Sequence, residues 1–98
     1  MVSWNDLSDD LKICVVIHKE NEAGRKVWMS RIVKILKGDV SRIRVSKTED
    51  RLYDLGIIDG KYEKYEGRWT RCFKIDSSAM SFVKNIVENL TGYPGEGP

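Results

Sequence analysis

The sequence predicts one small α+β domain that is mostly helical, with about four helices and a two- to three-stranded β element. Apolar residues recur at helical spacing before residue 56 and after residue 76, whereas they alternate between these two points. A chain of 98 residues is long enough for one hydrophobic core and too short for two. The last seven residues hold three Gly and two Pro, so we expect a domain over residues 1–91 and a flexible tail over residues 92–98.

The first helix is expected between about Asp6 and Glu22. Ser8 is a favourable N-cap residue, because its side chain can accept a hydrogen bond from the first helical turn, and Gly24 provides a stop. Apolar residues cover a wide face of this segment. The pattern therefore predicts a helix that is buried on most sides.

A short strand and a second helix are expected next. Residues 25–29 are compatible with a strand, and Ser30 is positioned to cap a helix that runs to Lys37 and ends at Gly38. A longer helix that starts at Lys26 is the alternative, and the sequence does not decide between the two.

The third helix is expected over residues 42–55, between a cap at Ser41 and a stop at Gly56. Its spacing predicts an inward face that consists of Val45, Leu52 and Leu55. Two helices joined by a short turn that contains Gly are typical of a helix-turn-helix.

The alternating pattern after Gly56 predicts a β-hairpin with strands over residues 57–65 and 68–75. Glu66 and Gly67 lie between the strands, and since Glu is less favoured than Asn or Asp at the first turn position, a loop of three or four residues is the alternative. Two aromatic side chains of the second strand are expected in the core: Trp69 and Phe73.

The last helix begins near Asp76 and ends before Gly92. It carries an apolar stripe of Phe82, Val83, Ile86, Val87 and Leu90. This stripe can pack on the domain's own core or pair with the same stripe of a second copy across a twofold axis. We expect the second arrangement, a homodimer.

The segment from Ser30 to Ile58 resembles the helix-turn-helix of winged helix-turn-helix proteins, and in particular of MarR-like transcription regulators. The resemblance rests on Val40-Ser41, Val45-Ser46-Lys47-Thr48 and the run from Asp50 to Ile58. It implies that the third helix enters the major groove of double-stranded DNA and that the hairpin 57–75 forms the wing.

Two features depart from the MarR-like pattern. Glu49 stands where the family has an apolar core residue. Either Glu49 pairs with a cation such as Arg51 or Arg42 at the surface, or the helix is turned slightly from the predicted phase. The chain is also shorter than most MarR-like proteins.

The distribution of charge supports nucleic-acid binding, although the net charge is only +2. Residues 25–51 carry nine basic and three acidic side chains, whereas residues 1–24 carry two basic and five acidic ones. The cations therefore concentrate on the predicted helix-turn-helix, as expected for a protein that contacts phosphates.

Three groups of residues are predicted to contact DNA. Those of the third helix are Arg42, Arg44, Lys47, Thr48 and Arg51, of which Arg51 is assigned to phosphate. Those on or before the second helix, assigned to phosphates, are Lys26, Arg31 and Lys34. Those of the wing are Lys64 and Arg68, for which ion pairing with Glu63 and Glu66 across the hairpin is an equally weighted alternative.

We therefore expect a small prokaryotic-type transcription regulator that recognises double-stranded DNA. A winged-helix protein-interaction module within a larger complex is the alternative, and RNA binding is a weaker one. Cys14 and His18 lack the further ligands that a metal site needs, and no nucleotide-binding or catalytic motif is present. We expect no enzyme activity, no cofactor, no membrane anchor and a cytoplasmic location; the sequence identifies no small-molecule effector.

Overall fold

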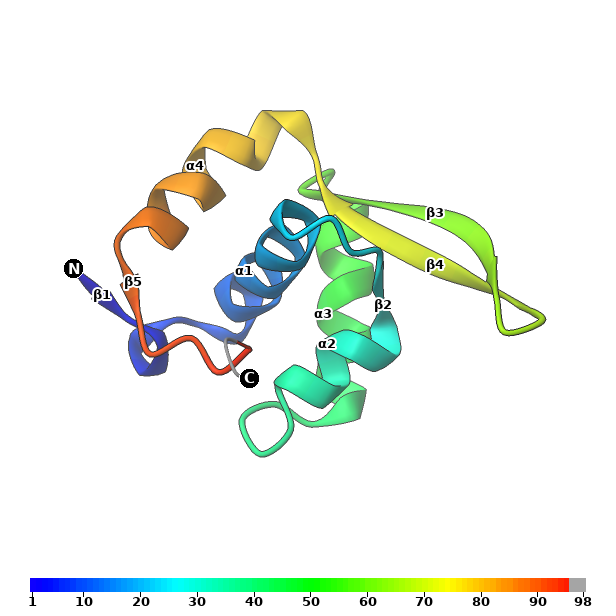
Figure 1. Ribbon diagram of the computed structural model, residues 1–98, viewed down its shortest axis with the longest axis horizontal. Helices are drawn as coiled ribbons and strands as arrows, with labels where there is room; N and C mark the ends of the chain where they lie inside the picture. Colours follow the sequence, from blue (N-terminus) through cyan, green and yellow to red (C-terminus); the bar gives the residue numbers. More distant parts are fainter. Residues whose placement is uncertain (96–98) are drawn as a thin grey trace.

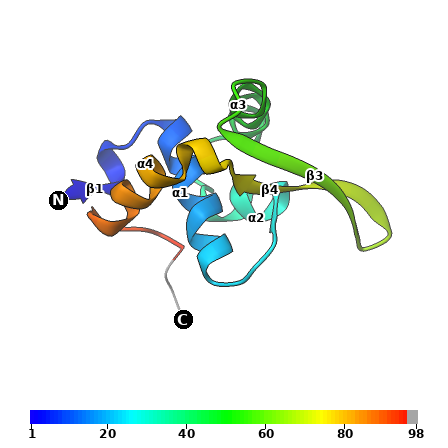
Figure 2. The same cartoon turned by 90° about the horizontal axis from the view of Figure 1, so that it is seen from above.

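The computed structural model describes residues 1–95. The elements follow in the order β1 (Val2–Ser3), a 3-10 turn η1 (Trp4–Asp6), α1 (Asp9–Glu22), β2 (Val27–Trp28), α2 (Met29–Ile35), α3 (Arg42–Asp54), β3 (Ile58–Tyr65), β4 (Arg68–Ile75), α4 (Ser77–Glu88) and β5 (Leu90–Thr91). Helix α1 contacts α2, α3 and α4, and the β3–β4 hairpin extends away from the helices (Figure 1). Figure 2 shows the same projection of the hairpin from above. This arrangement is the predicted α+β fold of a winged helix-turn-helix.

Three helices begin where the sequence predicts them. Ser8, Ser41 and Asp76 precede α1, α3 and α4, and each side chain accepts a hydrogen bond from a backbone N–H of the first turn. Gly24 and Gly56, which follow α1 and α3, have φ values of +78° and +76°. Glycine adopts this left-handed conformation without a steric penalty, so these positions end the helices.

Helix α2 differs from the prediction at both ends. It begins at Met29, directly after β2, and the preceding residue makes no side-chain cap, so Ser30 is not the N-cap. It ends at Ile35, whereas the sequence placed its end at Lys37. The alternative of a helix from Lys26 is wrong, because residues 27 and 28 pair with β4 as a strand.

The sheet has the order β2-β4-β3 with antiparallel neighbours. Pairing between β3 and β4 continues to Tyr65 and Arg68, so the hairpin loop contains only Glu66 and Gly67. Their φ values of +50° and +79° match the two-residue turns whose twist suits a hairpin. The alternative of a longer loop is therefore wrong, and Glu66 adopts a conformation that Asn, Asp or Gly usually provides.

The two aromatic residues assigned to the core from β4 separate. Phe73 is buried, whereas Trp69 is 68% exposed. Trp69 lies in the outer half of the hairpin, where most side chains of β3 and β4 are exposed. Leu55, predicted to point inward from α3, is likewise exposed because it lies at the C-cap after the last helical turn.

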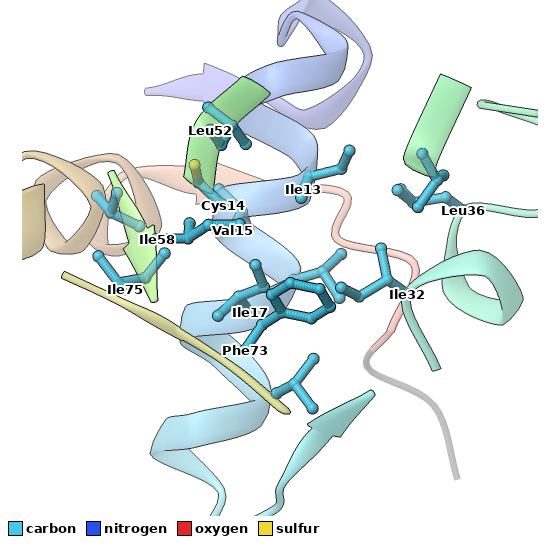
Figure 3. Packing of buried hydrophobic residues seen from close by; sticks show 14 of the residues in the cluster. Ile13, Cys14, Val15, Ile17, Ile32, Leu36, Leu52, Ile58, Phe73 and Ile75 are labelled. Carbon is cyan, nitrogen blue, oxygen red and sulfur yellow. The ribbon is translucent and has the colours of Figure 1, made fainter. Parts of the chain in front are cut away.

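The hydrophobic core surrounds α1. Figure 3 shows side chains from α1, α2 and α3 meeting those from the base of the hairpin. The central members shown there are Ile13, Ile17, Ile32, Leu52, Ile58 and Phe73. The wide apolar face of α1 is thus confirmed as a mostly buried helix.

The two ends of the described chain lie together. Strands β1 and β5 form a short parallel pair, which the sequence did not predict. Trp4 is buried and donates a hydrogen bond through Nε1 to Asp39 at 3.0 Å, and the ring of Tyr93 packs edge-on against it at 5.4 Å. Tyr93, which the sequence assigned to the tail, thus packs against Trp4, and residues 96–98 of the predicted tail lie outside the described chain.

Candidate nucleic-acid interface

Helix α3 presents a charged outer face because its inner face is held in the core. Val45, Thr48, Glu49 and Leu52 are buried. Thr48, which we predicted to contact bases, is only 5% exposed and therefore cannot belong to a surface interface in this conformation. The other predicted α3 contacts are exposed: Arg42, Arg44, Lys47 and Arg51.

Two of these exposed cations are engaged by acidic residues at the start of α1. Arg44 lies 2.5 Å from Asp9, and Arg51 lies 2.6 Å from Asp10, measured between Nη2 and the carboxylate oxygen. Arg42 and Lys47 form no ion pair with any residue from 1 to 95. The sequence separates these charges by more than 30 positions, so only the packing of α1 against α3 reveals the pairs.

The predicted phosphate contacts near α2 are also partly engaged. Glu20 of α1 is buried and receives hydrogen bonds from Arg25 and from Arg31. Burial opposes ionisation of Glu20, but the two arginine hydrogen bonds outweigh it and lower its pKa below the ordinary 4.5. Lys26 donates to Glu63 of β3 at 2.6 Å.

Lys34 remains exposed and forms no ion pair within the described chain, and it lines a hollow of about 470 Å³ beside α2. A second hollow of about 510 Å³ adjoins it, between the start of α3 and the hairpin. Arg42 of α3 and Arg68 of β4 both line this second hollow. The rings of Trp28 and Tyr65, stacked at 4.8 Å, line both hollows.

These two adjoining hollows form one groove, which we call the α3–wing groove. It brings together predicted residues from all three groups: Lys26, Arg31 and Lys34 on or before α2, Arg42 from α3 and Arg68 from the wing. Trp28 and Tyr65 were not predicted as site residues, and their place in the groove depends on the pairing of β2 with β4.

The outer part of the wing combines cations with aromatic rings. The Lys64 ammonium lies 5.9 Å from the centre of the exposed Trp69 ring, which is within cation–π range. The predicted alternative paired Glu63 with a cation across the hairpin. In the structure Glu63 instead pairs with Lys26, which precedes β2. Lys64 and Arg68 are both exposed.

Glu49 resolves the departure noted in the sequence. It is 2% exposed, so it occupies the core position in the predicted helix phase and does not pair at the surface with Arg51 or Arg42. Burial raises its pKa to about 8, with Asp50 adding to the shift and Arg71 opposing it. The surface ion pair offered from the sequence is therefore wrong.

The predicted dimer stripe on α4 divides between core and surface. Val83 is 1% exposed and packs in the domain's own core, whereas Phe82 is 60% exposed and the remaining three members are half-buried. Phe82 and the exposed Leu55 line an apolar hollow of about 250 Å³ between α1, α3 and α4. This surface and the α3–wing groove lie at opposite ends of α3, with Leu52 and Leu55 here and Arg42 in the groove.

Cys14 and His18 do not form a reactive pair. Burial, assisted by the charge of Asp10, raises the pKa of the Cys14 thiol to about 12, so it remains protonated. His18 lies 3.5 Å from Glu22. Within residues 1–95, no three His, Cys, Asp or Glu side chains are grouped to hold a metal ion, and no helix has the length and apolar character needed to span a bilayer.

Comparison with solved structures identifies the same fold. Protein AF1382 of Archaeoglobus fulgidus is similar over 82% of this chain and 81% of its own, with a TM-score of 0.67 and 15% identity. The circadian clock associated protein Pex from Anabaena matches over 85% of this chain and 76% of its own, with a TM-score of 0.63 and 16% identity. Bacillus subtilis PadR, solved in complex with operator DNA, has a TM-score of 0.65 and 10% identity over 91% of this chain.

The match spans about half, 51%, of the PadR chain. No protein-family model matches the sequence, and no curated protein does. At these identities the similarity shows the winged helix-turn-helix fold alone.

Proposed function

We propose that this protein is a transcription regulator that binds double-stranded DNA, with α3 in the major groove and a phosphate backbone in the α3–wing groove. The main supporting observation is that Arg42 of α3 and Arg68 of β4 line the same hollow. Neither arginine forms an ion pair with a carboxylate of residues 1–95. Cations at such a groove position phosphates, while residues near the start of a recognition helix reach base edges.

Within α3, the structure supports a narrower set of contacts than the sequence suggested. Arg42 and Lys47 are exposed and form no ion pair in the described chain, so they contact DNA without first breaking one. Arg44 and Arg51 must first exchange Asp9 and Asp10 for phosphate. Exposed ion pairs contribute only about 0.2–1 kcal/mol each, so this exchange costs little.

A solved structure and the sequence resemblance add support. PadR shares the fold and was solved with operator DNA. The resemblance of residues 30–58 to MarR-like regulators points the same way, and it favours recognition of a palindrome by a homodimer. For the dimer we propose the apolar hollow beside Phe82 as the contact, because Leu55 and Phe82 expose apolar surface at its rim.

The test is selection from a random duplex library at two salt concentrations. We expect an enriched site whose affinity falls about 150-fold between 50 and 200 mM salt, which is the value for four phosphate contacts. Arg42→Ala and Lys47→Ala should each weaken binding to that site, whereas Lys84→Ala, an exposed cation on α4, should not. Absence of enrichment together with unchanged binding by both α3 variants would show the proposed face to be wrong.

A protein-interaction module is the second candidate, and the exposed apolar rim of Leu55 and Phe82 is the observation that favours it. It predicts no salt-dependent binding to duplex DNA. Sedimentation distinguishes the two uses of this rim. Phe82→Ala should dissociate a homodimer formed through it, whereas wild type and variant should both sediment as monomers if the rim contacts a different protein.

A further inference from the structure

A small hollow of about 190 Å³ lies between α3 and the hairpin, and Glu49 lines it. It adjoins the α3–wing groove, with which it shares Met29 and Thr70. Glu49 is 98% buried, and its Oε2 atom has no hydrogen-bond partner among the described residues. A buried carboxyl oxygen without a partner costs free energy, and native proteins seldom retain one without a reason. The hollow beside it offers the space for a partner.

The walls of the hollow are largely aromatic. Tyr62 of β3 and Trp69 and Phe73 of β4 line it, with Met29 of α2 completing the apolar surface. Trp69 and Tyr62 are exposed to 68% and 63%, so their rings are accessible from solvent. The ammonium of Lys64 already lies 5.9 Å from the centre of the Trp69 ring, so a ligand would share this ring with Lys64. Aromatic faces attract cations.

The charges around the hollow leave one carboxylate uncompensated. The charged or titratable groups that line it are Glu49, Asp50, Tyr62 and Arg71. Arg71 donates to Asp50 at 2.6 Å and lies 5.1 Å over the ring of Tyr53 and 5.6 Å over that of Phe73, so its position is set by these contacts. When Glu49 is ionised, the hollow therefore lacks one positive charge.

We propose that this hollow is a binding site for a small organic cation, in which Glu49 is the counter-ion and the rings of Tyr62, Trp69 and Phe73 surround the apolar body. A primary ammonium group can donate to Oε2 of Glu49 and also contact the rings. The ligand is small, because the volume lies below the roughly 300–1,000 Å³ of sites for drug-sized molecules.

Ligand binding and ionisation of Glu49 are coupled. In the ligand-free protein, burial raises the pKa of Glu49 to about 8, so the carboxyl is mainly protonated at neutral pH. A bound cation favours the carboxylate, and binding near pH 7 therefore releases a proton. Apparent affinity should rise by about tenfold per pH unit below pH 8 and level off above it.

The test uses phenethylammonium as the probe, with the neutral 2-phenylethanol and the anionic phenylacetate as isosteres. Isothermal titration in two buffers measures affinity and proton release, and the NMR signal of the Trp69 indole N–H reports the location. We expect the cation to bind roughly tenfold more tightly than the alcohol, the anion to bind more weakly still, and the Trp69 signal to shift.

Glu49→Gln removes the counter-ion while it preserves the shape of the side chain. This variant should bind cation and alcohol equally and should lose both the proton release and the pH dependence. Asp54→Asn, which removes an exposed carboxylate from the same helix outside the hollow, should bind as wild type does. The proposal is overturned if the cation binds no better than the alcohol, if Glu49→Gln retains the preference, or if the Trp69 signal does not respond; none of these readouts involves DNA.

Discussion

Replacing Glu49 with Gln should stabilise the protein, and the gain should grow with pH. The side chain is 2% exposed, and burial raises its pKa from the ordinary 4.5 to about 8. Between these two values the unfolded chain has released the proton that the folded protein still binds. Stability must therefore fall as pH rises from about 4.5 to about 8, and the contribution is constant outside that window.

The size of the effect follows from the same pKa difference. Each pKa unit corresponds to about 1.36 kcal/mol, so ionisation of Glu49 opposes folding by about 3 kcal/mol at pH 7 and by about 5 kcal/mol once pH exceeds 8. Gln is neutral at every pH and has nearly the same shape. Small domains are stable by only about 5–15 kcal/mol, so the gain is a large fraction of the total.

Urea denaturation monitored by tryptophan fluorescence measures this difference. The free energies of unfolding of wild type and Glu49→Gln should agree near pH 4 and diverge progressively to pH 8.5. Asp54→Asn is the control, because this carboxylate is exposed on the same helix and its removal should give no comparable divergence. A difference between Glu49→Gln and wild type that stays constant over this range would falsify the assignment of a raised pKa to Glu49.

Three further predictions concern other contacts. The double variant Asp9→Asn/Asp10→Asn frees two cations of α3 that wild type must first exchange, so duplex DNA affinity measured by fluorescence anisotropy should rise by about 2- to 30-fold. An unchanged affinity would exclude these cations from the interface. Glu20→Gln removes the charge and one of the two oxygens that accept from Arg25 and Arg31, and it should cost about 1–3 kcal/mol in urea denaturation. Because the pKa of Glu20 is lowered, wild type should lose this advantage as pH falls below 4.5, and a pH-independent loss would contradict the assignment. Gly67→Ala should cost about 1 kcal/mol, since φ there is +79° and open space surrounds the site, and a neutral result in the same assay would show that the turn relaxes.

Local signals predicted the parts of the fold that depend on local physics. The starts of three helices followed from capping side chains, and the hairpin followed from alternation around a turn, although the length of its loop was left open. The start of α2 lacks a side-chain cap, because the chain passes directly from a sheet pair into the helix. Contacts between distant segments, such as the β1–β5 pair and the packing of Tyr93 on Trp4, leave no comparable signal in the sequence.

The sequence predicted which types of residue form the candidate site better than it predicted which of these side chains are exposed. Helical spacing identified the exposed cations of α3, but it did not separate Thr48 from them, because a residue near the edge of a helical face is buried or exposed according to what packs beside it. Glu49 is also buried although its residue type is usually exposed. A charged residue at an inward position contradicts the hydrophobic pattern, and this contradiction was itself the one sequence signal that led to the hollow.

The charge segregation along the chain acquires a different meaning in three dimensions. Within the described structure, five of the nine cations in residues 25–51 form ion pairs, and three of the carboxylates involved come from the acidic first helix. Helix α1 therefore neutralises much of the basic segment and leaves Lys34, Lys37, Arg42 and Lys47 as its cations without a described ion pair. An isolated protein with this surface attracts DNA weakly at long range. Since exposed pairs are cheap to exchange, phosphates that reach Arg44 and Arg51 in the correct geometry can displace Asp9 and Asp10, whereas a loosely placed backbone gains nothing by doing so. On the proposed function, the acidic helix thus reduces nonspecific binding more than it reduces binding to a matched site.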